Sequence, residues 1–421
     1  MVKTTHLFAL IITFCFFITS CVSAQTTETT TGADSGEPEG VQSYDKTYIA
    51  PTPENPAGTG TTVYIDAAHN NFHTADNRFK PFADLIRNDG YLVESFDHLF
   101  TSESLADVDI LVISNPVNDS NTPEENWIAP IESAFTADEI DVLVDWVYEG
   151  GSLMLIADHF PFPGAVEELA ARFGFQVDNG YNFDPHYYSD LRDQFFELPV
   201  IKDIQAGTAD PNSEETQGRI FAQAAPLFIA LGAQVNSLNF WAPYASPADS
   251  LFAEGDGTVT NPLQSYGEPE NNFLAPVPYI TTFTGQSFTY VDQPGLTFCP
   301  LMVMGNGTYT VLTEAQDAYF GPDVNSSNSN MLTSLLTTGD VPDFIVPVTD
   351  STGKLQGATV ESGEGKVAFF GEAGMFTAQI AADGVTKMGM NNPAASHNWQ
   401  FALNVVRYLD GYLAFDCIPV R

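Results

Sequence analysis

Two histidines and an aspartate follow the first apolar run of the part of the chain expected to fold. In "TTVYIDAAHNNFH", residues 61–73, Asp66 ends the apolar run, and His69 and His73 lie within the next seven positions. Imidazole nitrogens beside carboxylate oxygens suit Zn, Mn or Fe, and a carboxylate beside a bound water can act as a general base. The same residues also suit a polar turn, because Asp and Asn side chains bond loop amides and cap helices.

Acid–base side chains follow two further apolar runs. Asp158 and His159 come directly after residues 152–157, and Glu372 comes shortly after residues 366–370. If these runs are parallel strands, their carboxyl ends meet at one edge of a sheet, where open α/β sheets bind ligands. The sequence therefore predicts one site for metal-assisted or acid–base chemistry; its cofactor is left open, with a divalent metal ion (Zn, Mn or Fe) as the candidate. The predicted proton carriers are Asp66, Asp158, His159 and Glu372, the predicted metal ligands are His69, His73 and His159, and the predicted ligand-binding residues are Asn70, Asn71, Gln379 and Asn391.

Alternating strands and helices must position these residues. Strands are predicted at 61–66, 91–96, 109–114 and 152–157, and amphipathic helices follow the first, third and fourth of them. The clearest helix start is Thr136, with Glu139 three residues later, a pair that predicts a capping box. This alternation with short connections predicts a parallel, doubly wound sheet with helices on both faces.

Residues 181–355 break this rhythm. They are rich in Asn, Asp, Pro, Ser and Gly and contain only scattered apolar runs, which predicts an insertion or subdomain of loops and short antiparallel strands. The regular pattern returns in residues 356–421. The predicted fold is an α/β, flavodoxin-like, doubly wound and mainly parallel sheet formed by residues 59–180 and 356–421, with a loop-rich, partly antiparallel insertion between them.

The N-terminus has the features of an export signal. Lys3 precedes the apolar stretch "HLFALIITFCFFITS", which suits a signal peptide over residues 1–24 and is too short to span a bilayer. Two cleavage sites compete: "ITSC" resembles a lipobox that would lipidate Cys21, and "VSA" ending at Ala24 suits ordinary signal peptidase. Residues 25–58 are polar and predict a flexible linker. We expect an exported protein without a transmembrane helix, either an outer-membrane or periplasmic lipoprotein or a secreted one.

Charge and cysteine content limit the partners. The chain has 14 basic and 54 acidic residues, a formal net charge of −40, which repels nucleic acid and anionic lipid. A small polar or carbohydrate ligand is expected instead. Cys299 and Cys417 are the two cysteines beyond the export signal and would suit one disulfide in an oxidising compartment. The chain has no CxxC motif, which disfavours a thiolate zinc site.

The stretch "WVYEGGSLMLIADHFPFPG" resembles the class I glutamine amidotransferase-like superfamily, in particular its ThuA-like branch. Together with the segments around His69 and Glu372, it is similar to secreted bacterial proteins of unknown function that share this fold. The resemblance covers residues 61–180 and 355–412 and implies a flavodoxin-like sheet. Glutaminases carry a cysteine nucleophile in the corresponding turn, where this chain has Asp158 and His159. Glutaminase activity is therefore not expected.

Two functions remain open. The leading hypothesis is an exported ThuA-like protein that carries out metal-assisted or acid–base hydrolysis of a small polar or carbohydrate ligand. The alternative is a non-catalytic surface lipoprotein that binds a glycan or a protein. Aromatic residues of the insertion, such as Tyr181 and Trp241, would then stack on sugar rings.

Overall fold

The structure is a computed structural model of the 421-residue chain. It describes residues 42–58, 60–122, 126–183, 198–209, 216, 219, 234–237, 279–283, 285–304, 309–312, 348–380, 387–414 and 417. The predicted signal peptide, Cys21 and Trp241 lie outside the described residues, as does most of the predicted insertion.

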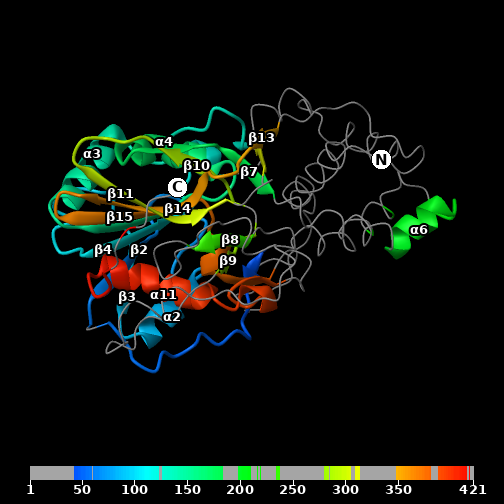
Figure 1. The fold of residues 1–421 in the computed structure, drawn as a ribbon, viewed down its shortest axis with the longest axis horizontal. Coiled ribbons are helices and arrows are strands. Elements are labelled where there is room, and N and C mark those ends of the chain that lie inside the picture. Colours follow the sequence, from blue (N-terminus) through cyan, green and yellow to red (C-terminus); the bar gives the residue numbers. More distant parts are fainter. Residues whose placement is uncertain are drawn as a thin grey trace, which may run out of the picture.

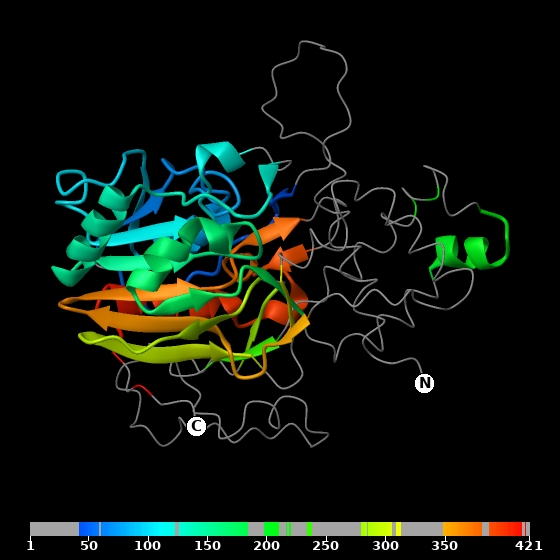
Figure 2. The same cartoon turned by 90° about the horizontal axis from the view of Figure 1, so that it is seen from above.

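An eleven-stranded sheet forms the centre of the molecule (Figures 1 and 2), and one half of it is parallel. The spatial order in this half is β3-β2-β4-β5-β15. Every residue of β4 and β5 is buried, as expected for strands covered on both faces. The strands are β2 (Thr62–Asp66), β3 (Leu92–Phe96), β4 (Ile110–Ser114), β5 (Ser152–Ile156) and β15 (Gly365–Phe370).

The other half of the sheet is antiparallel. From β15 the sheet continues through β14, β11, β8 and β9, and β10 pairs with both β14 and β6. The α/β class is confirmed, but the antiparallel part is larger than the sequence pattern indicates, because apolar runs of the predicted insertion join the main sheet. The strands of this second half of the main sheet are β6 (Phe175–Val177), β8 (Gln234–Ser237), β9 (Tyr279–Thr281), β10 (Phe288–Tyr290), β11 (Leu296–Val303) and β14 (Leu355–Ser362).

Two small sheets accompany the main one. The first has the order β1-β16-β17, and its strand β1 comes from the segment predicted as a linker. The second has the order β13-β12-β7. Their bounds are β1 (Ser43–Tyr44), β16 (Ala378–Ile380), β17 (Lys387–Gly389), β7 (Gly180–Phe183), β12 (Tyr309–Leu312) and β13 (Val348–Asp350).

Helices cover both faces of the parallel half (Figure 1): α3 (Ala137–Tyr148) and α4 (Phe162–Arg172) lie on one face, and α2 (Lys80–Asn88) and α11 (Asn398–Leu409) lie on the other. Two apolar cores result, one on each face of the sheet. The predicted capping box is present at the start of α3. The remaining helices are α6 (Pro199–Gln205), η2 (Asp119–Asn121), η6 (Gly374–Phe376) and η7 (Pro393–Ala395). Within the described ranges, no helix has the length and apolar character needed to cross a membrane.

Two long-range links fix the last part of the chain. Arg407 of α11 forms a buried, two-point ion pair with Asp89 at the end of α2, with N–O distances of 2.8 and 2.6 Å. Asp89 also accepts a hydrogen bond from the backbone of Ala57, so the N-terminal segment joins the same contact. A disulfide between Cys299 and Cys417 ties the end of the chain to β11.

Loss of one partner of the buried pair should strongly destabilise the fold. We expect Arg407→Met to lower the free energy of unfolding by about 3–5 kcal/mol, because the Asp89 carboxylate stays buried without its counter-charge. The matched control is Arg172→Met, which breaks the exposed pair with Asp141 and should cost about 1 kcal/mol or less. Urea denaturation measures both variants, and equal losses would contradict the assignment.

Candidate functional site

The strand order of the parallel half reverses between β2 and β4. The chain leaves β2 for β3 on one side and returns to β4 on the other, so a crevice is expected between β2 and β4. The loop after β2 crosses this position. The side chain of Asn71 accepts a hydrogen bond from the backbone of Ser114 at 3.0 Å, and the backbone of Phe72 donates to Asn115 at 2.9 Å. These contacts hold the loop over the end of β4.

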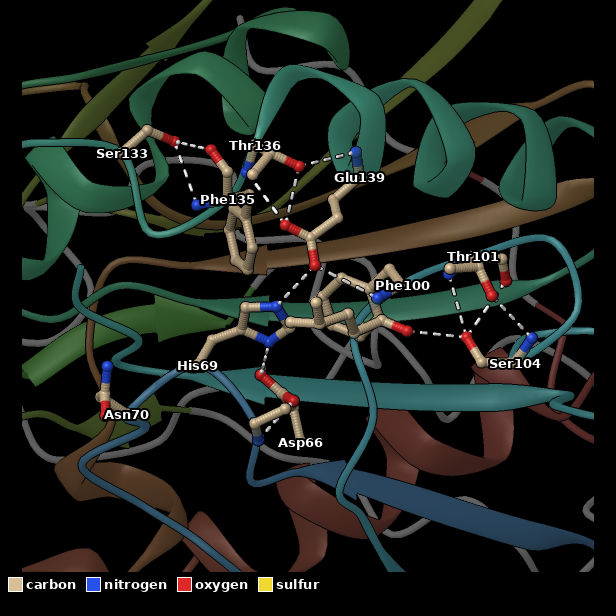
Figure 3. Close-up of polar contacts among 12 residues, drawn as sticks. Asp66, His69, Asn70, Phe100, Thr101, Ser104, Ser133, Phe135, Thr136 and Glu139 are labelled. Atoms are coloured by element: carbon tan, nitrogen blue, oxygen red, sulfur yellow. Dashed lines mark hydrogen bonds and ion pairs between the residues drawn. The ribbon is translucent and has the colours of Figure 1, made fainter. Parts of the chain in front are cut away.

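His69 lies inside this loop between two buried carboxylates (Figure 3). Its Nδ1 is 2.9 Å from Asp66 Oδ2, and its Nε2 is 3.0 Å from Glu139 Oε1. A carboxylate accepts hydrogen bonds, so both ring nitrogens must carry a proton and the ring is an imidazolium. All three side chains are at least nine-tenths buried, and Phe100 stacks on the imidazole at a centroid distance of 4.4 Å.

The pKa shifts agree with a charged imidazole. Burial lowers the pKa of His69, but the hydrogen bonds and charges of Asp66 and Glu139 outweigh it and raise the pKa above its ordinary value. Burial raises the pKa of Glu139, but hydrogen bonds from Thr136 and His69 lower it by a larger amount. The pKa of Glu139 is therefore below its ordinary value. Glu139 therefore has two roles, since the carboxylate that completes the capping box of α3 also holds His69.

A second pair of carboxyl groups lies at the ends of β5 and β15. Asp158 accepts hydrogen bonds from the backbone of His159 at 2.7 Å and of Ala373 at 3.0 Å. Glu372, 1% exposed, accepts a hydrogen bond from the backbone of Met375 at 2.7 Å. Burial, and then the charge of Asp158, raise the pKa of Glu372 well above its ordinary value despite its hydrogen bonds to backbone amides. Glu372 therefore keeps its proton to a higher pH than an ordinary glutamate does.

The backbone is packed tightly around Glu372. Gly285 has a positive φ of 76°, and a Cβ atom there would lie 2.7 Å from Glu372 Cγ. A Cβ atom on Gly374 would lie 2.5 Å from Glu372 Oε1. Both positions therefore require glycine to leave room for this carboxyl group.

His73 and His159 lie on two loops of the same edge. His73 is buried, and burial together with the charges of Arg78 and His159 lowers its pKa well below the ordinary value. His159 is half-buried, and its Nδ1 is 2.7 Å from the backbone oxygen of Phe160. A backbone oxygen only accepts, so Nδ1 of His159 carries the proton.

The predicted ligand-binding amides fall into two places. Asn71 donates to Asp66 at 2.5 Å, and Asn70 donates to Asp119 at 2.8 Å, outside the His69 network (Figure 3). Gln379 and Asn391 lie together beside the small sheet of β1, β16 and β17, where Asn391 donates to the backbone of Gln379 at 2.9 Å. The structure therefore places Asn70 and Asn71 in the loop after β2, and Gln379 and Asn391 in the β16–β17 region.

The predicted metal site can be compared with the part of the chain that the structure describes. No group of three or more His, Cys, Asp and Glu side chains there could hold a metal ion. Both ring nitrogens of His69 already face carboxylates. Ligation by His69, His73 and His159 stays a prediction from the sequence, and elemental analysis of the purified protein tests it.

Sequence patterns did not reveal a buried hydroxyl cluster beside the sheet of β7, β12 and β13. Ser287, Thr310 and Ser351 bond one another, and Thr310 donates to Asn182 at 2.5 Å. Ser287 also donates to Asp178, which forms an ion pair with Lys354. The three hydroxyl residues are 23 to 64 positions apart, and their bonds to Asn182 and Asp178 span more than 100 positions, so no local pattern joins them. Their mutual hydrogen bonds indicate a structural role.

The charge of His69 should make stability fall as pH rises. A pKa raised above 6.5 in the folded protein gives a stabilisation that is complete below pH 6.5 and is lost as pH rises through the folded-state pKa. His69→Gln should lower the free energy of unfolding by about 3–5 kcal/mol at pH 6, because two carboxylates stay buried without a cation. The difference in unfolding free energy between the wild type and His69→Gln should become smaller toward pH 9. Urea denaturation across this range measures it, and a constant deficit would show that the ring is neutral.

Glu372→Gln and Glu139→Gln should change the pH dependence of stability in opposite directions. Wild-type protein loses stability as pH rises from 4.5 through the raised pKa of Glu372, so the Glu372→Gln variant should become relatively more stable with rising pH. Glu139, whose pKa is lowered, stabilises the fold above pH 4.5 and loses this effect as pH falls through its folded-state pKa. Glu139→Gln should therefore be the less stable variant at neutral pH. Thermal melts at several pH values compare the two, and parallel curves would refute the protonation states.

Comparison with known proteins gives distant structural similarities. No family model matches the sequence, and no curated protein matches it. Among solved structures, the chain is similar to the mmIFT52 N-terminal domain, with 13% identity, a TM-score of 0.42, and coverage of 83% of this chain and 97% of that one. It is also similar to a ThuA-like protein from Bacteroides uniformis, with 8% identity, a TM-score of 0.33, and coverage of 86% and 95%. An exo-beta-1,4-mannosidase from Opitutaceae bacterium strain TAV5 has 11% identity, a TM-score of 0.31, and coverage of 85% of this chain and 37% of that one.

Proposed function

We propose that this is an exported α/β protein that carries out acid–base hydrolysis of a small polar, carbohydrate-like ligand at the carboxyl edge of the parallel strands. The observation that carries the proposal is the pair formed by Asp158 and Glu372 beside His159. A carboxyl group with a raised pKa next to a second carboxyl group is a common feature of acid–base sites. The pKa of Glu372 is raised well above its ordinary value, while Asp158 accepts two backbone hydrogen bonds.

Each side chain has a distinct part in the proposed reaction. Asp158 takes a proton from a water molecule as the water oxygen bonds to the carbon under attack. The bond from this carbon to the leaving oxygen breaks, and His159, which is half-buried, gives that oxygen a proton. Glu372 is a positioning residue, because it is buried behind Asp158 and, when protonated, adds no negative charge beside it.

The wider assignment has separate support. Counted along the chain, the five parallel strands have the order 2-1-3-4-5, which supports a flavodoxin-like sheet. The resemblance of residues 146–164 supports a ThuA-like relation. The apolar segment before Cys21 supports export, with or without a lipid anchor. The disulfide between Cys299 and Cys417 suits an oxidising compartment.

One observation favours the alternative function, a glycan-binding module without catalysis. Phe72, Trp127 and Phe162 form an aromatic group with centroid distances of 5.3 to 5.9 Å, next to His159. Phe72 and Trp127 are only half-buried, so their rings are partly accessible. Partly accessible rings beside polar groups suit stacking on a sugar ring.

Asp158→Asn tests the hydrolase. A panel of 4-nitrophenyl glycosides should identify a substrate of the wild-type protein, and the variant should lose about a hundredfold or more in kcat, because a general base contributes about that much. The control is Asp141→Asn, an exposed carboxylate of α3 that pairs with Arg172. Undiminished turnover in Asp158→Asn would refute the proposed base. Saturable glycan binding without turnover by the wild type would instead support the binding module.

A further inference from the structure

Asn115 turns the chain sharply at the end of β4. It is 1% exposed and has a φ of 54°, in the left-handed region that Asn adopts more readily than most other residues with a side chain. Its backbone N–H donates to the oxygen of Ile156 at 3.0 Å, so the turn begins where β4 still pairs with β5. Because β4 lies between β2 and β5 in the sheet, Asn115 is next to the loops that follow both of these strands.

Asn115 bonds each of these loops with a different oxygen atom. Its side-chain Oδ1 accepts a hydrogen bond from the backbone N–H of Asp158 at 2.9 Å. Its backbone oxygen accepts one from the backbone N–H of Phe72, also at 2.9 Å. A single residue therefore connects the loop that carries the proposed general base with the loop that carries a partly accessible aromatic ring.

The carboxylate of Asp158 depends on this connection for its place. Its Oδ2 accepts a hydrogen bond from the backbone of Ala373 at 3.0 Å, and its Oδ1 accepts one from the backbone of His159 at 2.7 Å. His159 is the chain neighbour of Asp158, so that bond moves with the loop. The bond to Asn115 instead holds the main chain of Asp158 against the end of β4.

We propose that Asn115 is a positioning residue that sets the place of Asp158 relative to the ligand bound at Phe72. The inference rests on the proposed function and adds to it a buried residue that acts on catalysis only through Asp158. The side chain of Asn115 holds the base, whereas its main chain holds the loop of Phe72. A substitution of the side chain should therefore change turnover and leave ligand binding nearly unchanged.

Steady-state kinetics of the purified mature protein, with a 4-nitrophenyl glycoside that it hydrolyses, test this separation. Asn115→Gly keeps the positive φ and the backbone bond to Phe72 but loses Oδ1. Its kcat should fall about tenfold to a hundredfold, because a small misplacement of a catalytic group costs that much. Its KM should stay within about twofold of the wild-type value, since the loss is confined to the transition state.

The matched control is Asn179→Gly. Asn179 also has a positive φ, of 47°, and its Oδ1 also accepts a backbone hydrogen bond, from Gly164 at 3.1 Å. This variant loses the same kind of bond at a place that does not hold Asp158, so its kcat should stay at the wild-type value. An equal fall in kcat in both variants would show a general loss of structure and overturn the positioning role.

A double variant tests whether Asn115 acts through Asp158. In the Asp158→Asn background there is no base to misplace, so Asn115→Gly should cause no further fall in kcat. If the two losses instead multiply, Asn115 acts on another part of the site and the inference is wrong.

Amide hydrogen exchange gives a readout that does not depend on turnover. Asn115→Gly should raise the exchange rate of the Asp158 amide by about tenfold or more, because the hydrogen bond that protects it is lost. The amide of Ala157, which donates to Phe370 at 2.9 Å, should keep its rate. An unchanged rate at Asp158 would overturn the proposal.

The kinetic outcomes separate this inference from the proposed function. Loss of turnover in Asp158→Asn together with a wild-type kcat in Asn115→Gly would overturn the positioning role and leave the hydrolase intact. Undiminished turnover in Asp158→Asn would refute the base and this inference with it. A wild-type protein that hydrolyses none of the glycosides would also refute both.

Discussion

The protonated imidazole of His69 contacts three parts of the chain at once. It bonds Asp66 at the end of β2 and Glu139 in the first turn of α3, and it stacks on Phe100 of the segment between β3 and β4. A buried charge requires compensation on each side, because the interior does not solvate it. The position where β2 and β4 diverge is therefore closed by a charged network, and the remaining polar groups of this edge are arranged around it.

The other acid–base side chains of this edge lie at the ends of β5 and β15. Asp66 and His69 are bonded to one another, whereas Asp158 and His159 lie in the loop after β5. The two groups differ in electrostatic character. The first combines one cation with two carboxylates, and the second contains Glu372, whose pKa is raised by burial and by the charge of Asp158. A single edge of the sheet thus carries two polar groups of different charge.

Local patterns in the sequence predicted the helices and parallel strands well, but not the long-range contacts between them. The parallel strands, the capping box at Thr136 and the segments that carry Asp158 and Glu372 all follow from periodicity and from turn chemistry. The second role of Glu139 could not be inferred, because a capping glutamate already has a sufficient local explanation and His69 is 70 residues away. The antiparallel half was underestimated for a similar reason, since strands of three to eight residues in a polar segment show little period.

The position of β15 has a consequence for the order in which the molecule can be assembled. This strand lies between β5 and β14, so among the strands that the structure describes it is residues 365–370 that join the parallel and antiparallel halves of the main sheet. The ion pair of Asp89 with Arg407 spans 318 positions, and the bond from Ser152 to Leu409 spans 257. Contacts this distant in sequence slow folding, because the intervening chain must be ordered before they form. Nearly the whole polypeptide must therefore be synthesised before its central sheet can close.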